Sequence, residues 1–525
     1  MENYTEFNPK RDNYFSSIKR QYNDIVNRPK IIAAYEKEAF NSKWKAISSK
    51  EKVKLILKKV ALPFGIKKSL LLGSYRLEED FRQRLQDMEV YEDILQSRIR
   101  HQKGEKIYSG KQHPIVKENT SPQTIDWAES FKTLLNDSKS YIALMVENLD
   151  SGGLEKVVSC LATWFCKNDI PVKVFCTRNG GKIERNLRNE GVDVLVFHGK
   201  KSLFNNYLKK NPPLLVNTHF VSDFYGIIHH YQIPIVEVIH NMYFFLTDKQ
   251  LKQEQKKQQY ITHYIAVSEA AKEVFYYKVS QITNDKITVI GNSGAIEKDA
   301  LHLCNSPKEK MGFSEDTFIF LAVGSIDARK NQIGIVRAFD IVKSLITAPL
   351  VLILAGAITD YEYSEKINMI IAERNLQNDI IFWGYTENIV DIMNASDALI
   401  VNSYYEGWSM AATEALHCGL PLIHSKCGSG KELIANGQNG ILIDNPIENI
   451  ISLSSIELYD KMHMGINENI SQLAAAMINM FENKETWKMH REKVKKYAQE
   501  NFTQSNMMQE YLHVYDETYH KFMAN

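Results

Sequence analysis

Short apolar runs recur along the sequence in two series, and this recurrence constrains the fold more than any other feature. The first series comprises Tyr141–Val146, Val172–Cys176, Val192–Phe197, Leu214–Val216, Ile235–Ile239 and Tyr264–Val267. Longer segments with helical spacing, such as Leu154–Phe165 and Ala270–Lys278, separate these runs. Runs that are apolar throughout are typical of strands buried on both faces of a parallel sheet. The alternation therefore predicts a doubly wound α/β domain.

The same alternation starts again in the second half of the chain. Its apolar runs are Phe318–Val323, Val351–Ala355, Ile380–Trp383, Ala398–Val401, Leu422–His424 and Ile441–Ile443. Two such series predict two facing Rossmann-like domains, with a linker near Ile290 to Gly312. Because ligands of parallel sheets bind beyond the carboxyl ends of the strands, we expect the functional site in the cleft between the domains.

Length and composition agree with this organisation and exclude several classes of protein. The 525 residues exceed what one hydrophobic core comfortably holds. A formal net charge of +1 gives no reason to expect nucleic-acid binding. Six cysteines without a C-x-x-C pair argue against a disulfide framework or a zinc site. The N-terminus lacks a signal-peptide core and no apolar run is long enough to span a bilayer, so we expect a cytoplasmic protein.

Residues 1 to about 137 do not follow the pattern, and their charges and helix formers predict a helical extension and linker. Within it, Lys52–Lys68 is basic and amphipathic. Such a helix can lie on an anionic membrane, which would make the protein peripheral on the inner face. The alternative is a helix that packs on the rest of the protein with its lysines solvated. Pro63 and Gly65 interrupt the pattern and slightly favour this alternative.

The segment from Tyr405 to Leu422 is a glycine-containing loop that runs into a helix. The helix opens at Gly407, Trp408, Ser409 and Met410. The backbone N–H groups of these residues can bind an anion together with the helix dipole. Glu406 lies in the loop, and Glu414 lies about two helical turns further on, where a carboxylate can accept hydrogen bonds from a diol such as a ribose. Together they indicate a site for a nucleoside diphosphate. The alternative is an ordinary amphipathic helix with solvated acids.

The spacing of Glu406 and Glu414 resembles the E-x7-E signature of retaining, nucleotide-sugar-dependent glycosyltransferases, family 4 in particular. Residues 323–331 resemble the phosphate-binding segment of that family, with Lys330 in the lysine position. Residues 382–384, which end in Gly384, resemble the element that precedes the nucleobase site, and residues 152–158 resemble the first glycine-rich loop and helix. The similarity covers roughly residues 140 to 500 and is most specific from 318 to 445.

The resemblance implies the GT-B architecture, an α/β fold with two facing Rossmann-like domains. We therefore divide the chain into a helical extension (1–137), an acceptor domain (138–300), a donor domain (301–497) and a C-terminal helix (498–525). In this architecture the final helix, here within Thr503–Met523, often crosses back to the first domain.

The resemblance also implies a role for individual residues. Glu406 would contact hydroxyls of the donor sugar, and Glu414 would bind the ribose. Gly152 and Gly153 would let the first-domain loop approach the diphosphate closely. His240, which follows Ile235–Ile239, matches a histidine that family members direct at the donor sugar. His219 is a weaker candidate for the cleft.

Transfer of a sugar leaves negative charge on the departing diphosphate, and the enzyme must stabilise it. No Asp-x-Asp motif ends an apolar run, so we expect no metal and no other cofactor, and assign this role to Lys330. Family members commonly carry an arginine directly after the glycine that corresponds to Gly324, whereas this chain has Ser325. That phosphate contact is therefore either missing or replaced, and Arg329 is the candidate to replace it.

These observations predict a retaining glycosyltransferase that uses a UDP- or GDP-linked sugar, with His240, Lys330 and Glu406 as catalytic residues. The expected acceptor is a lipid-linked or cell-surface glycan, on the basis of family habit and the basic segment Lys52–Lys68. One alternative is a catalytically degenerate GT-B scaffold, which Ser325 keeps open. A second is a sugar-nucleotide epimerase on the same fold, against which the E-x7-E signature argues.

Overall fold

The computed structural model describes residues 127–524 apart from 138–139, 151, 222, 280–285, 294–306 and 436. Most of the predicted extension, including the basic segment Lys52–Lys68, lies outside the described residues. Helix α7 (Trp127–Asp137) is the first described element. The domain boundaries and the membrane contact stay predictions.

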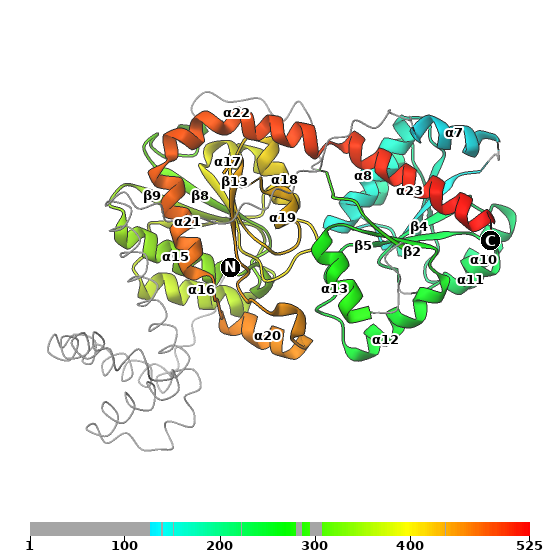
Figure 1. The fold of residues 1–525 in the computed structure, drawn as a ribbon, viewed down its shortest axis with the longest axis horizontal. Helices are drawn as coiled ribbons and strands as arrows, with labels where there is room; N and C mark the ends of the chain where they lie inside the picture. Colours follow the sequence, from blue (N-terminus) through cyan, green and yellow to red (C-terminus); the bar gives the residue numbers. More distant parts are fainter. Residues whose placement is uncertain are drawn as a thin grey trace, which may run out of the picture. The chain divides into compact units, whose positions relative to one another are not determined.

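Seven parallel strands form the first sheet, in the order β3-β2-β1-β4-β5-β6-β7 (Figure 1). They are β1 (Ile142–Asn148), β2 (Val172–Asn179), β3 (Asp193–Val196), β4 (Leu215–His219), β5 (Ile235–Ile239), β6 (His263–Ala266) and β7 (Ile287–Val289). The helices between them are α8 (Gly153–Lys167), α9 (Lys182–Asn189), α10 (Lys201–Lys210), α11 (Tyr225–His230), α12 (Asp248–Lys257) and α13 (Glu269–Val279). The winding direction reverses between β1 and β4.

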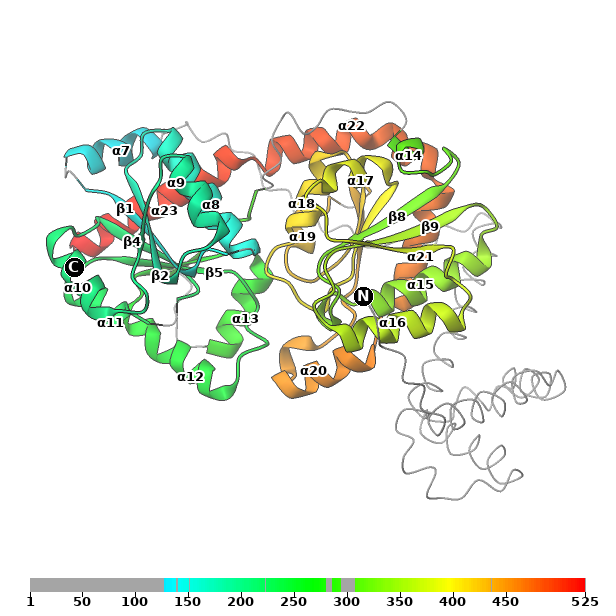
Figure 2. The same ribbon diagram turned by 180° about the vertical axis from the view of Figure 1, so that it is seen from behind.

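Six parallel strands form the second sheet, in the order β10-β9-β8-β11-β12-β13 (Figure 2). They are β8 (Phe318–Val323), β9 (Leu350–Ala355), β10 (Ile380–Gly384), β11 (Ala398–Val401), β12 (Leu422–Ser425) and β13 (Gly440–Ile443). The helices of this half are α14 (Pro307–Lys310), α15 (Gln332–Leu345), α16 (Tyr361–Glu373), α17 (Ile389–Ala395), α18 (Met410–His417), α19 (Gly430–Leu433), α20 (Ser455–Met464), α21 (Ile470–Glu482) and α22 (Lys484–Asn501). Here the winding reverses between β8 and β11.

The second sheet is buried on both faces, as its apolar runs predict. Successive strand residues point to opposite faces. Phe320 packs in the cluster that contains residues of α15, α16 and α21, and its neighbour Leu321 packs in the cluster that contains residues of α17, α18 and α22. A strand with helices on both sides has no polar face, which explains why its sequence does not alternate.

The last two helices link the two halves of the chain. Helix α22 packs against α18, and α23 (Gln504–Ala524) packs against α7 of the first half. The ring centroid of Tyr515 on α23 lies 6.2 Å from that of Phe131 and 6.3 Å from that of Phe165. The end of the chain therefore completes the core of the first sheet.

The predicted fold class is confirmed, since each predicted apolar run is a strand of one of two parallel sheets. Strand β7 was missed. It has three residues at the edge of the described sheet, where it pairs with β6, so its sequence is too short to stand out. Among the described residues, no helix combines the length and the apolar character that crossing a bilayer requires.

Candidate active site

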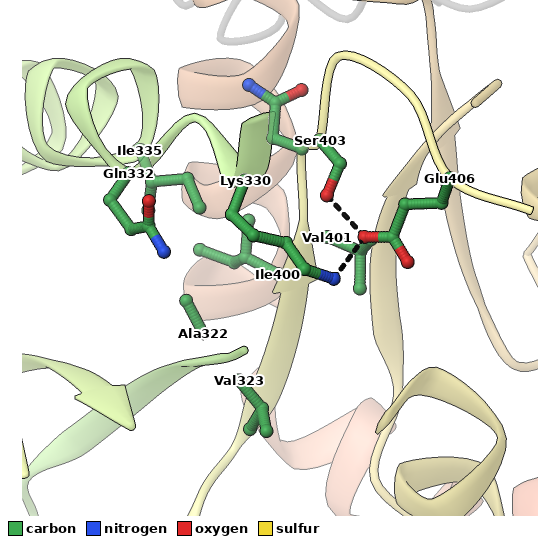
Figure 3. A pocket seen from close by; sticks show the side chains of 10 residues that line it. Ala322, Val323, Lys330, Gln332, Ile335, Ile400, Val401, Ser403 and Glu406 are labelled. Carbon is green, nitrogen blue, oxygen red and sulfur yellow. Dashed lines mark hydrogen bonds and ion pairs between the residues drawn. The ribbon is translucent and has the colours of Figure 1, made fainter. Parts of the chain in front are cut away.

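The centre of the second sheet brings together Lys330 and Glu406, which lie 76 positions apart in the chain. Lys330 follows β8 and Glu406 follows β11, the two strands that flank the reversal of winding. The Lys330 Nζ lies 2.5 Å from Glu406 Oε1, and Ser403 donates a hydrogen bond to the same oxygen (Figure 3). The pair lines a small pocket at the carboxyl end of the sheet, where ligands of this fold class bind.

A short 3-10 turn, η5 (Ala328–Lys330), positions the lysine. The Asp327 carboxylate caps this turn by accepting a hydrogen bond of 3.2 Å from the backbone N–H of Lys330. Gly324 has a φ of +148°, and a Cβ there would lie 2.9 Å from the Lys330 side chain. Position 324 therefore favours glycine both for its backbone conformation and for the lysine that crosses it.

The charge of Glu406 is fixed by its surroundings. Burial alone would raise the pKa of Glu406, but the positive charges of Lys330 and Arg329 and the hydrogen bonds from Lys330 and Ser403 outweigh it. The result is a pKa lowered from 4.5 to about 2. Glu406 is therefore an ionised, buried carboxylate at any pH near neutral.

Arg329 and Ser325 share one carboxylate. The Arg329 guanidinium lies 3.6 Å from Asp327 Oδ2, and the Ser325 hydroxyl donates a hydrogen bond to the same oxygen. The Arg329 side chain is 31% exposed, so it can reach a ligand. The structure places Arg329 next to Lys330, and its role in phosphate binding stays a prediction.

Helix α18 begins directly after the loop. The Ser409 Oγ caps it by accepting a hydrogen bond of 3.4 Å from Ala412 N, and the N–H of Ser409 donates one of 3.0 Å to Ser429 Oγ. In the described part of the chain, no hydrogen bond uses the N–H groups of Gly407, Trp408 and Met410. These three predicted donors have no acceptor among the described residues, whereas the N–H of Ser409 already has one.

Glu414 lies on α18 and is partly buried. Burial raises the pKa of Glu414 above its ordinary 4.5, and the positive charge of Lys156 on α8 opposes this rise. Among the described residues, none donates a hydrogen bond to the Glu414 carboxylate, whose oxygens can therefore accept hydrogen bonds from a ligand.

Helix α8, which carries Lys156, starts at the predicted glycine pair. Gly152 is its N-cap residue. No atom lies within 4 Å of the place where a Cβ of Gly153 would be, so the space beside this backbone is open. In the second half, the space beside Gly384 at the end of β10 is open in the same sense.

The loop of the second half touches the end of β5 in the first half. A Cβ on Gly407 would lie 1.9 Å from the carbonyl oxygen of His240. Only glycine permits this approach, which brings His240 and Glu406 into one neighbourhood. Burial lowers the pKa of His240 from 6.5 to about 3, so its imidazole is neutral. His240 Nε2 lies 2.8 Å from Nδ1 of His219, the weaker candidate.

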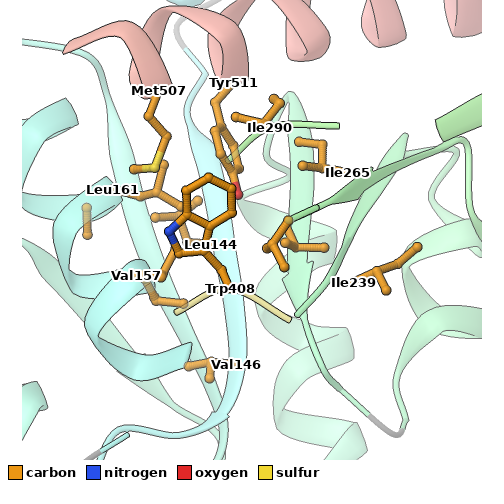
Figure 4. Close-up of a cluster of buried hydrophobic side chains, with 14 of the residues drawn as sticks. Leu144, Val146, Val157, Leu161, Ile239, Ile265, Ile290, Trp408, Met507 and Tyr511 are labelled. Carbon is orange, nitrogen blue, oxygen red and sulfur yellow. The ribbon is translucent and has the colours of Figure 1, made fainter. Parts of the chain in front are cut away.

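Trp408 contributes a backbone N–H to the site, but its side chain points into the core. The ring lies among Leu144, Val157 and Leu161 of the first half (Figure 4). Its Nε1 donates a hydrogen bond of 2.9 Å to Thr413 Oγ1. A Cβ on Gly291 would lie 2.4 Å from this ring, so Trp408 fills a closely fitted space between the two halves.

Sequence reasoning missed Ser403, which hydrogen bonds Glu406, and Gly356, whose N–H donates a 2.9 Å hydrogen bond to the carbonyl of Gly384. Gly356 directly follows the run Val351–Ala355, as Gly324 follows its own strand. This repeated placement was the available signal. Ser403 had no comparable signal, because its position depends on how the loop after β11 turns.

Two family models match this chain. The model described as Glycosyltransferase Family 4 matches residues 151–293, and the one described as Glycosyl transferases group 1 matches residues 306–460. Together they cover more than half of the chain, and the residues they match include His240 in the first model and Lys330, Glu406 and Glu414 in the second. The chain belongs to the GT-B glycosyltransferases of family 4.

Curated relatives of this family-4 chain match over parts of their length. The UDP-Gal:alpha-D-GlcNAc-diphosphoundecaprenol alpha-1,3-galactosyltransferase of Escherichia coli is 30% identical over 174 residues, which are 32% of this chain and 44% of the relative. The N-acetyl-alpha-D-glucosaminyl L-malate synthase of Bacillus anthracis is 23% identical over 163 residues, which are 31% of this chain and 42% of the relative. The chain thus spans less than half the length of these relatives.

Solved structures share the fold of the family-4 chain. Anabaena HepE, solved in complex with UDP and glucose, has a TM-score of 0.54 at 16% identity, and the match covers 72% of this chain and 100% of HepE. Sucrose-phosphate synthase of Thermosynechococcus elongatus has a TM-score of 0.56 at 16% identity, over 74% and 100% of the two chains. At such low identity these similarities establish the GT-B fold and nothing finer.

Proposed function

We propose that this protein is a retaining glycosyltransferase that moves a sugar from a nucleoside-diphosphate sugar to a glycan acceptor. The observation that carries the proposal is the Lys330–Glu406 pair at the reversal of winding in the second sheet. The loop and helix that follow Glu406 carry backbone N–H groups without an acceptor and the Glu414 carboxylate, and Gly407 in that loop contacts the backbone of the neutral His240. Family membership supports the same reaction class.

Each group has a task that its environment suits. Lys330, with Arg329 beside it, would offset charge that develops on the diphosphate, a role that we assign to these cations and not to a metal ion. Glu406 is ionised and would accept hydrogen bonds from sugar hydroxyls. Glu414 would do the same for the ribose diol. The free N–H groups at the start of α18 would bind phosphate oxygens.

For the acceptor, we propose a lipid-linked or cell-surface glycan. The name of the Escherichia coli relative, which acts on a diphosphoundecaprenol-linked sugar, supports this choice. Membrane contact through Lys52–Lys68 would bring the protein to such an acceptor. Binding of the full chain to anionic vesicles tests this contact. Equal binding after the lysines of this segment are changed to glutamine would refute it.

The donor is tested by thermal shift of the purified chain with UDP, GDP, ADP, CMP and their sugar conjugates, with and without EDTA. A ligand at about 100 times its Kd stabilises the fold by about 2.7 kcal/mol. We expect a selective shift that EDTA does not change and that Glu414→Ala removes, with the exposed Glu485→Ala as a matched control. No shift with any nucleotide would favour a degenerate scaffold.

The stereochemistry is tested on the product. Proton NMR of the transferred sugar reports its anomeric configuration, and we expect the configuration of the donor to be kept. An inverted product would contradict the retaining assignment. A product in which the donor sugar is isomerised but not transferred would instead indicate the epimerase.

A further inference from the structure

Four side chains form a continuous chain of hydrogen bonds that ends at His240. The Tyr515 hydroxyl lies 2.8 Å from Asn217 Oδ1, and His219 Nε2 lies 2.8 Å from the same oxygen. The other nitrogen of His219, Nδ1, lies 2.8 Å from His240 Nε2. Asn217, His219 and Tyr515 have no exposed surface, and His240 alone is half-buried. This series of hydrogen bonds therefore leads from the core to the candidate site.

The fold explains why these four side chains meet. Asn217 and His219 are two positions apart on β4, so both project from the same face of the sheet. His240 directly follows β5, which pairs with β4. Tyr515 comes from α23, 298 positions after Asn217 in the chain.

The direction of the hydrogen bonds follows from Asn217. Its Nδ2 donates a hydrogen bond of 3.0 Å to the carbonyl of Val236. In the rotated amide, two oxygens would face each other at that position, so Oδ1 must face Tyr515 and His219. An amide oxygen can only accept. Tyr515 therefore donates its hydroxyl proton, and His219 carries a proton on Nε2.

The protonation of His219 then fixes that of His240. Burial lowers the pKa of His219 well below 6.5 and that of His240 to about 3, so each ring carries one proton at neutral pH. Because the proton of His219 is on Nε2, its Nδ1 accepts, and His240 must donate from Nε2. The Nδ1 of His240 is left with a lone pair. In the described part of the chain, nothing is hydrogen bonded to this atom.

We propose that Asn217, His219 and Tyr515 are positioning residues that hold His240 as its Nε2–H tautomer, so that Nδ1 accepts a hydrogen bond from a substrate sugar hydroxyl. The hydrogen bond from a sugar hydroxyl rests on the proposed function, whereas the tautomer of His240 does not. The arrangement makes position 240 selective for a ligand group that donates a hydrogen bond.

The tautomer is measured without any substrate. Long-range proton–nitrogen NMR of the histidine-labelled full chain at neutral pH distinguishes Nε2–H from Nδ1–H rings, and His240→Asn identifies the signals of residue 240. We expect Nε2–H for both His219 and His240 in the wild-type protein. A His240 ring protonated on Nδ1 would overturn the proposal. The wild-type spectrum itself shows which nitrogen of His240 is protonated, so the test does not depend on whether a variant folds.

A pair of substitutions at His219 tests positioning. Glutamine can accept from His240 and donate to Asn217, whereas leucine can do neither. We expect His219→Leu to give mixed tautomers of His240 and about a tenfold lower kcat/KM for sugar transfer, and His219→Gln to restore both within about threefold. In a His240→Asn background, His219→Leu should change kcat/KM less than twofold, because it acts through His240. If His219→Leu lowered kcat/KM equally in the wild-type and the His240→Asn backgrounds, the positioning role of His219 would be overturned.

Tyr515 has a matched control on its own helix. Among the described residues, the buried hydroxyl of Tyr511 has no hydrogen-bond partner, so Tyr511→Phe removes a similar group that takes no part in these hydrogen bonds. We expect Tyr515→Phe to increase the minor tautomers of His219 and His240 and Tyr511→Phe to leave them unchanged. Equal spectra would exclude Tyr515 from the proposal. Wild-type protein with the expected tautomer but no sugar transfer would refute the proposed function alone.

Discussion

At the scale of single residues, the Lys330–Glu406 pair is a charge balance that the protein maintains in the absence of ligand. Both side chains are largely buried, at 17% and 6% exposure, and either one alone would be an uncompensated buried charge. A bound diphosphate would give Lys330 a second anionic partner. The pair therefore keeps the cation oriented before the donor arrives.

The low pKa of Glu406 makes its contribution to stability dependent on pH. The pKa is about 2 in the folded protein against 4.5 ordinarily, so the unfolded chain binds more protons between these values. The stabilisation is complete above about pH 4.5 and is lost as the pH falls toward 2, on the order of 3 kcal/mol in total. Urea unfolding of wild type and Glu406→Gln from pH 7 to pH 3 should therefore show a difference that shrinks on acidification. A constant difference would contradict the ion pair.

Arg329 is expected to bind donor phosphate where Ser325 provides no positive charge. We predict that Arg329→Ala weakens donor binding about tenfold, the effect of losing one charge-assisted contact of about 1.4 kcal/mol. The exposed Lys493→Ala on α22 removes the same charge away from the site and should leave affinity unchanged. Calorimetric titration with the nucleotide found by thermal shift measures both. Equal affinities would exclude Arg329 from the phosphate site.

At the scale of elements, the contact between the loop before α18 and the end of β5 depends on Gly407. Alanine there would place its Cβ 1.9 Å from the His240 carbonyl oxygen, so the two elements must move apart. We predict that Gly407→Ala lowers the unfolding free energy by about 1–3 kcal/mol. Gly153→Ala, which meets no atom within 4 Å, should cost nothing by the same measurement. Similar stabilities of the two variants would show that the contact is not close.

The sequence predicted most of the elements because buried parallel strands are locally recognisable. The boundaries of β5, β8 and β11 coincide with their apolar runs. Strand β7 was missed because three residues at an edge leave no pattern. Lys330 and Glu406 could be predicted because each lies in the loop after a recognisable strand, within a segment that resembles a motif of the family. The partnership of Asn217, His219 and Tyr515 could not, since it depends on where α23 returns.

At the scale of the whole molecule, Trp408 connects the two halves. Its ring comes from the second half and is packed among Leu144, Val157 and Leu161 of the first (Figure 4). We predict that Trp408→Ala lowers the unfolding free energy by about 3–5 kcal/mol and separates one calorimetric transition into two. The control is Trp383→Ala, whose side chain is 38% exposed. A single transition with a loss no larger than that of the control would contradict this link.

The return of α23 to the first sheet also has a consequence for synthesis on the ribosome. The strands of the first half emerge first, and the whole second half is made before Tyr515, whose side chain fills their core. At about 5–20 residues per second, the first half waits roughly 10–45 s for that helix. During this interval Phe131 and Phe165 lack the aromatic partner they have in the finished protein. Nascent chains stalled before α23 should therefore be held by chaperones longer than chains released with it.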